Sequence, residues 1–97
     1  MMKLTFHEEA ESEVAEAVQY YERRSVGLGA SFIDVIEKAI DEVRDNPTAH
    51  QLISKEVLRK LLDPFPYSFL YVIEDDTIRV IAVAHQKRRP VYWRNRR

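Results

Sequence analysis

The sequence contains no cysteine, which excludes disulfide scaffolds, zinc–cysteine sites and thiol catalysis. It has only two glycines and four prolines, so there is little room for flexible linkers or disorder. No apolar run approaches the roughly 20 residues that a membrane helix needs. The first residues turn acidic at once and carry no apolar segment of signal-peptide length. We therefore expect a cytoplasmic protein with no membrane partner.

Metal-ligating and cofactor-binding patterns are also missing. The three histidines, His7, His50 and His85, are far apart, and none has another histidine at helical spacing. The short Gly27–Gly29 motif lacks a third glycine and joins two predicted helices, so it is no phosphate loop. We expect no metal and no cofactor. The length of 97 residues predicts one domain, residues 1–97, without internal repeats.

The net charge of −1 hides a strong asymmetry. Residues 1–50 carry 5 Lys/Arg against 11 Asp/Glu, a net charge of −6, and residues 51–97 carry 10 against 5, a net charge of +5. The stretch 85–97 holds six of these cations and no acid. A basic tail on an acidic body indicates an anionic partner, such as nucleic acid or an acidic protein, or simply a solubilising terminus.

Two helices are predicted in the first half. Apolar residues recur on one helical face over 8–24, while Glu9, Glu13, Glu16 and Glu22 mark the opposite, solvated face. Thr5 and Glu8 have the spacing of a capping box. A second apolar stripe runs from residue 28 to 45 and includes Ile36. The glycines between the stripes predict a turn, hence an antiparallel helical hairpin.

Strand patterns occupy the rest of the chain. A short strand is expected at 3–6, a mixed apolar and basic strand at 55–62, and an aromatic, β-branched strand at 67–73. Residues 78–84 contain a single charge, which predicts a central strand. Residues 90–97 form either a short helix or a tail. The predicted fold class is α+β, in the order β-α-α-β-β-β, with the helical hairpin on one face of a mostly antiparallel sheet.

The C-terminal half also carries the candidate chemistry. A histidine at a strand end, several arginines and a nearby tyrosine are what metal-free RNA scission needs, namely proton transfer and stabilisation of phosphorane charge. We single out Arg59, His85, Arg89 and Tyr92 as candidate catalytic residues. The candidate substrate-binding residues are Lys60, Lys87, Arg88, Trp93 and Arg94. Strand alternation should place Arg79, Ile81, Val83 and His85 on one face. The alternative is that His85 is an ordinary polar residue and that Tyr92 and Trp93 close the core.

The sequence resembles the RelE/ParE superfamily, the toxins of type II toxin–antitoxin modules, also called plasmid-stabilisation proteins. The resemblance covers nearly the whole chain. The motifs that carry it are Glu9-Ala10, Tyr20-Tyr21, Gly27-x-Gly29-x-x-Phe32, Asn46-Pro47, Arg59, Phe65-Pro66-Tyr67, Tyr71 and Ala82-Val83-x-His85-x-x-Arg88-x-Pro90-x-Tyr92-Trp93. It implies a toxin that an antitoxin silences by wrapping around it, and the complex is expected to be a heterotetramer or a larger assembly.

The resemblance leaves two targets open. RelE-like toxins cut mRNA on the ribosome, and we take this endonuclease activity, with inhibition of translation, as the first hypothesis. ParE-like toxins inhibit DNA gyrase without cutting RNA, which is the alternative, together with a toxin fold that has lost its activity. The arginine expected after the tyrosine of the central strand is Ser68 here, and a second expected arginine falls near Gln86. The terminal tyrosine matches Tyr92.

Overall fold

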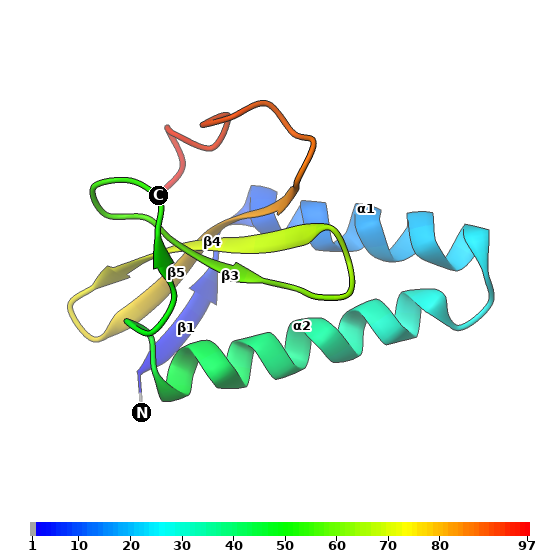
Figure 1. The fold of residues 1–97 in the computed structure, drawn as a ribbon, viewed down its shortest axis with the longest axis horizontal. Helices are drawn as coiled ribbons and strands as arrows, with labels where there is room; N and C mark the ends of the chain where they lie inside the picture. Colours follow the sequence, from blue (N-terminus) through cyan, green and yellow to red (C-terminus); the bar gives the residue numbers. More distant parts are fainter. Residues whose placement is uncertain (1) are drawn as a thin grey trace.

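The computed structural model describes residues 2–97, and two helices pack there on one side of a five-stranded sheet. Figure 1 shows the helices side by side, with the C-terminal segment arching over the other side of the sheet. In chain order the elements are β1 (Lys3–Phe6), α1 (Glu8–Arg24), α2 (Leu28–Asp45), β2 (Gln51–Leu52), β3 (Leu58–Leu61), β4 (Tyr67–Glu74) and β5 (Thr77–His85). The predicted α+β class and element order are confirmed, with one additional strand, the two-residue β2.

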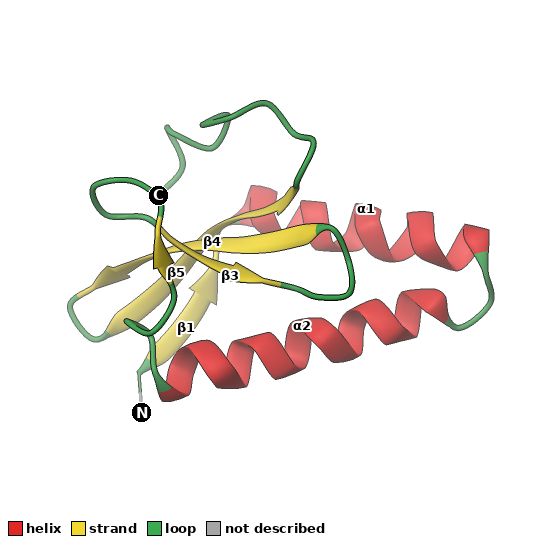
Figure 2. Ribbon diagram, in the orientation of Figure 1, coloured by secondary structure: helices red, strands yellow, loops and turns green. Residues whose placement is uncertain are grey.

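The sheet has the order β1-β5-β4-β3-β2 and is mixed (Figure 2). The strands β2 to β5 form an antiparallel meander, whereas β1 lies parallel to β5. A parallel neighbour requires a crossover connection, and here the chain passes from β1 through the α1–α2 hairpin and then through β2, β3 and β4 before it forms β5. The strand β5 is therefore central along its first half, as its apolar sequence predicts.

Helix α1 begins at Glu8, as predicted, but its cap differs from the expected one. The cap is His7, whose Nδ1 accepts a hydrogen bond from the Glu9 amide at 3.0 Å. The expected capping box of Thr5 and Glu8 is wrong, because Thr5 belongs to β1 and its hydroxyl accepts from Arg79. Acids in the first turn and Arg23 and Arg24 in the last turn match the helix dipole.

Both glycines of the helical turn are required by the backbone. Gly27 has a φ of 89°, in the left-handed region. A Cβ on Gly29 would lie 2.9 Å from the carbonyl oxygen of Val18 and from a carboxylate oxygen of Glu22. That carboxylate accepts hydrogen bonds from the amides of Gly27 and Gly29, at 2.9 and 3.0 Å. Glu22 therefore caps the start of α2 while it remains exposed, as the sequence predicted.

Two apolar clusters lie on the two faces of the sheet. The larger lies under the helices and includes Phe32, Ile36, Val43, Phe69 and Tyr71. The side chain of Ile36 is 6% exposed, as predicted. The smaller cluster lies on the outer face, where Trp93 covers side chains of β4 and β5.

The C-terminal segment, residues 86–97, is neither the expected helix nor an extended tail. It is a chain of turns, in which the amides of Arg94 and Arg96 donate to the carbonyl oxygens of Val91 and Trp93. The segment is held down by the buried ring of Trp93. Arg97 also pairs with Glu56 and Glu74, at 2.6 and 3.1 Å.

Candidate functional site

A hollow of about 760 Å³ lies between the β3–β4 turn, the outer face of the sheet and the C-terminal segment. We call it the basic groove, after the cations that line it, Arg59, Arg88 and Arg89. Its walls also include His85, Tyr92 and Trp93, and its single acidic residue is Asp63. Such a groove favours an anionic ligand or an acidic partner.

Six of the nine predicted site residues line this groove, namely Arg59, His85, Arg88, Arg89, Tyr92 and Trp93. The remaining three, Lys60, Lys87 and Arg94, do not line it. Lys60 is directed elsewhere, because its ammonium group pairs with Glu42 of α2 at 3.1 Å. The roles assigned to all nine residues stay predictions.

The predicted alternation of β5 is wrong, because a β-bulge interrupts it. Leu70 pairs with Ala82 and Tyr71 pairs with Val80, so Ile81 is an extra residue. Ile81 and Ala82 therefore both pack in the outer cluster, while Val83 returns to the helix-covered core.

The bulge decides where His85 points. His85 is opposite Tyr67, and the rings of these two residues meet edge to face at 5.1 Å. The ring of Tyr67 also packs against Phe32 of α2, so His85 starts from the helix-covered face. Arg59 is opposite Leu70, on the outer face. The side chains of Arg59 and His85 thus start from opposite faces of the sheet and border the groove from two sides.

Both residues already have intramolecular partners. The Nδ1 atom of His85 accepts a hydrogen bond from the Lys87 amide at 3.0 Å, which stabilises the turn after β5. Arg59 donates through Nη2 to the side chain of Gln51. Its Nε atom is buried and has no partner within residues 2–97, so one donor of this guanidinium remains to be satisfied.

Tyr92 is held by α1. Its hydroxyl donates to a carboxylate oxygen of Glu13 at 2.8 Å, and its ring lies between the guanidinium groups of Arg88 and Arg96, at 4.0 and 4.9 Å. Burial, together with the bond to Glu13, raises the pKa of this phenol far above its usual value of 10. A phenol in this state does not release its proton at neutral pH.

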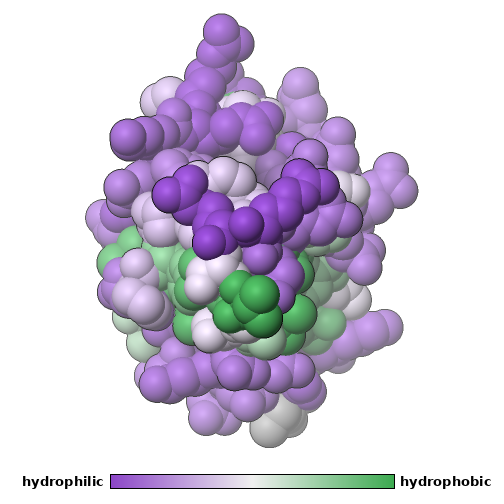
Figure 3. All heavy atoms as spheres, turned by 90° about the vertical axis from the view of Figure 1, so that its right-hand side faces the viewer, coloured by the Kyte–Doolittle hydropathy of each residue, from purple (hydrophilic) through white to green (hydrophobic). Residues whose placement is uncertain are grey.

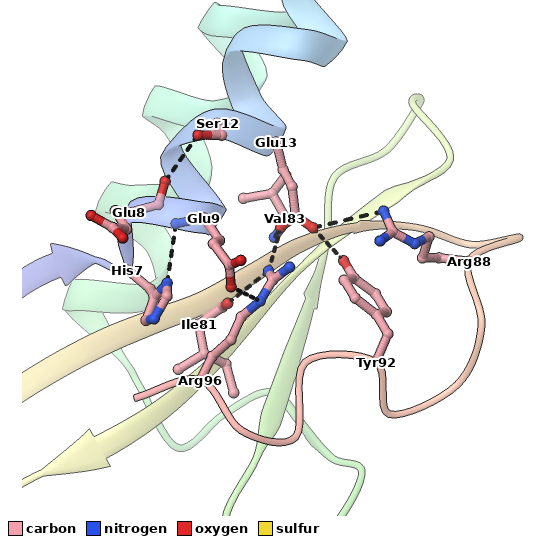
Figure 4. A network of polar contacts seen from close by, with 10 residues as sticks. All are labelled: His7, Glu8, Glu9, Ser12, Glu13, Ile81, Val83, Arg88, Tyr92 and Arg96. Carbon is pink, nitrogen blue, oxygen red and sulfur yellow. Dashed lines mark hydrogen bonds and ion pairs between the residues drawn. The ribbon is translucent and has the colours of Figure 1, made fainter.

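Glu13 is the residue that the sequence analysis misplaced. Its side chain is only 10% exposed, although the helical pattern assigned it to the solvated face. Besides Tyr92, its carboxylate accepts from the Val83 amide and from Arg96, both at 2.9 Å (Figure 4). Arg96 in turn donates to the carbonyl oxygen of Ile81 at 3.2 Å and pairs with Glu9 at 3.0 Å.

We call Glu13, Tyr92 and Arg96 the latch. Beyond the end of β1, no strand covers the edge of β5. There the latch supplies hydrogen-bond partners to the Val83 amide and the Ile81 carbonyl oxygen, and it ties the C-terminal segment to α1. The signal in the sequence is faint, since it consists of one glutamate among several on α1 and one arginine among several at the end of the chain.

Other kinds of site are not found in residues 2–97. This part of the chain has no group of three or more potential metal ligands. None of its helices is both long enough and apolar enough to span a membrane.

The fold and the groove define a small α+β protein in which a helical hairpin backs a sheet and a basic groove lies at the strand ends. The sequence matches the family described as the ParE toxin of the type II toxin-antitoxin system, parDE, over residues 4–90. The chain therefore belongs to the ParE toxin family, within the superfamily that the sequence resemblance indicated.

A solved structure supports the fold assignment. It is described as the chromosomal ParDE TA system from P. aeruginosa, with a TM-score of 0.66 and 15% sequence identity. The alignment covers 88% of this chain and 96% of the other. At this identity the similarity establishes the fold alone. No curated protein sequence matches the chain.

Proposed function

We propose that this protein is the toxin of a type II toxin–antitoxin module and that it acts in the cytoplasm by inhibiting DNA gyrase, without cutting RNA. Membership of the ParE toxin family supports this choice over the endonuclease hypothesis. The observation that carries it is the state of Tyr92, whose hydroxyl is bound to Glu13 at 2.8 Å.

RNA scission requires a base and an acid that act on either side of one phosphate. Tyr92 is a poor candidate for either role, because its proton is committed to Glu13 and its pKa is raised by burial. His85 and Arg59 start from opposite faces of the sheet. The chain thus presents a binding surface in which the tyrosine has a structural role.

A two-arm assay tests the proposal. Purified protein is added to a gyrase supercoiling reaction and, separately, to translating ribosomes whose mRNA is then mapped for cuts. We expect loss of supercoiling and intact mRNA. Ribosome-dependent cuts in the mRNA, with normal supercoiling, would overturn the proposal.

The endonuclease remains a second candidate because one specific observation favours it. Arg59, Arg88 and Arg89 line one groove with His85, and a phosphorane needs such cations. Tyr92→Phe distinguishes the two, since it keeps the ring and removes the proton. If Tyr92 transfers a proton during cleavage, this variant should cut RNA about 10²–10⁴-fold more slowly. A gyrase inhibitor should keep its toxicity, provided that thermal melting shows the variant folded.

We also infer that an antitoxin segment covers the basic groove and the outer face of the sheet. The net charge of +5 on residues 51–97 suits an acidic, disordered segment that folds on contact. Affinity measured by calorimetry should fall as salt rises, because the groove arginines are partly exposed. Affinity independent of salt, or a footprint confined to the outer faces of the helices, would contradict this.

A further inference from the structure

A second hollow, of about 470 Å³, lies at the end of the molecule that carries the α1–α2 turn. We call it the tyrosine hollow. It is lined by Tyr20, Tyr21, Arg24, Pro66, Tyr67 and His85. Figure 3 shows this end of the molecule, where hydrophobic side chains form a central patch surrounded by hydrophilic ones. The hollow is distinct from the basic groove, although Pro66, Tyr67 and His85 border both.

Two of the three hydroxyl groups in this hollow are not used by the fold. Those of Tyr21 and Tyr67 have no hydrogen-bond partner within residues 2–97. The hydroxyl of Tyr20 accepts from Arg24 at 3.1 Å, so its own proton stays available. Burial, the largest cause, raises the pKa of both Tyr21 and Tyr67. These phenols therefore remain protonated donors at neutral pH.

Two nitrogen donors complete the set. Because Nδ1 of His85 accepts the Lys87 amide, the proton of the neutral imidazole lies on Nε2. Arg24 contributes a guanidinium whose only hydrogen bond within the described chain is to Tyr20. No acidic side chain lines the tyrosine hollow. A ligand must therefore bring the acceptors.

The rings that carry these donors are fixed in place by their neighbours. Tyr67 meets His85 edge to face at 5.1 Å, Tyr20 meets Tyr21 at 5.2 Å, and Tyr21 packs on Phe65 at 4.8 Å. This packing restricts Tyr21, Tyr67 and His85 before any ligand arrives, whereas Tyr20 is 51% exposed. The entropic cost of ordering the site is thereby reduced.

We propose that the tyrosine hollow binds a tetrahedral oxyanion of the phosphate class. Phosphate offers acceptors in several directions, which suits hydroxyl, imidazole and guanidinium donors that come from different elements. Tyr20, Tyr67 and His85 also border an adjoining hollow, which holds Glu13 and Glu16 together with Arg88. Glu13 is already neutralised by Arg96 at 2.9 Å.

The chain offers a matched pair of variants to test this site. Arg23 and Arg24 are adjacent in the last turn of α1 and carry the same charge, but only Arg24 lines the hollow. Inorganic phosphate is titrated into the full chain while NMR follows the ring signals of Tyr20 and Tyr21, which line the tyrosine hollow and not the basic groove. We expect Arg24→Ala to weaken binding about tenfold, the loss typical of one charge-assisted hydrogen bond. Arg23→Ala should change it by less than about twofold.

Further measurements make the outcome decisive. Tyr67→Phe should weaken phosphate binding while the melting temperature stays unchanged, since its hydroxyl has no partner in the fold. Acetate should bind more weakly than phosphate. Equal losses in the two arginine variants, acetate binding as tight as phosphate, or shifts confined to the basic groove would each overturn the proposal. None of these outcomes depends on gyrase inhibition, so the two proposals fail independently.

Discussion

The two faces of the sheet are covered by different means. On the helix-covered face, Phe32, Val43 and Phe69 are completely buried, and apolar packing joins the hairpin to the strands, together with the ion pair of Lys60 and Glu42. On the outer face the cover is a run of turns anchored by one indole ring and by the charged latch. A single chain thus combines an apolar core with a polar closure.

The difference indicates where stability and function reside. Apolar burial contributes most of the favourable free energy of folding, and salt does not screen it as it screens pairs of exposed charges. The latch and the pairs of Arg97 depend on charge, and several of their members are partly exposed. We therefore expect the outer face, next to the basic groove, to open first, and the helix-covered face to set the global stability.

The largest expected effect comes from the helix-covered core. Ile36→Ala should lower the free energy of unfolding by about 2–5 kcal/mol, because it removes buried methyl groups and leaves a cavity. The matched control is Ile33→Ala on the same helix, where the side chain is 41% exposed. Urea denaturation of both variants measures the difference. Equal losses would mean that the phase of α2 is wrong.

The next effect concerns the latch. Glu13→Ala leaves the Val83 amide and the Tyr92 hydroxyl without their acceptor, and should cost about 2–3 kcal/mol. The protein has a single tryptophan, and Trp93 lies in the segment that the latch holds. Its fluorescence should shift to the red as the segment loosens. Glu16→Ala, at an exposed position of the same helix, is the control and should leave the emission unchanged.

A smaller effect is expected at the helical turn. Gly29→Ala places a Cβ 2.9 Å from the Val18 carbonyl oxygen and should cost about 1–3 kcal/mol by overpacking. Gly27→Ala meets no atom within 4 Å and should cost about 1–2 kcal/mol through its left-handed backbone alone. Chemical denaturation separates the two. If Glu22→Ala relieves the Gly29→Ala loss, the contact with that carboxylate is responsible.

The sequence predicted the elements whose patterns are regular. The stripe that includes Ile36 identified α2, and the aromatic run at 67–73 identified β4, because local periodicity records which face is buried. The two-residue β2 carries no such pattern. Its assignment depends on pairing with β3, which is a tertiary contact.

The candidate site was harder to predict for physical reasons. The extra residue at Ile81 reverses the alternation of β5, and nothing in an apolar run marks where a bulge falls. Glu13 was assigned to solvent because its partners, Tyr92 and Arg96, lie about eighty residues further along the chain. The charge asymmetry did locate the basic part of the molecule, because the net charge of a segment can be counted without knowing how its strands pair.

The smallest expected effect is a pH dependence of stability that comes from His50, a polar residue next to the helix-covered core. Burial, and then the charge of Lys60, lowers the pKa of His50 below its usual 6.5, and its Nε2 is buried with no partner within residues 2–97. The unfolded chain therefore binds this proton more readily than the folded chain. Stability should be fully present above about pH 7 and should fall as the pH drops below the unfolded value of 6.5.

His50→Asn should remove this dependence. Between pH 7 and pH 5 the melting temperature of the variant should therefore fall less than that of the parent. Glu42 does not obscure the window, because its hydrogen bond with Lys60 lowers its pKa below 4.5, and its contribution is lost only at lower pH. Glu42→Gln should extend the loss of stability to lower pH, because the charge of Glu42 raises the pKa of His50 and its removal lowers that pKa further. A His50→Asn variant that keeps the pH slope of the parent would show that another group titrates there.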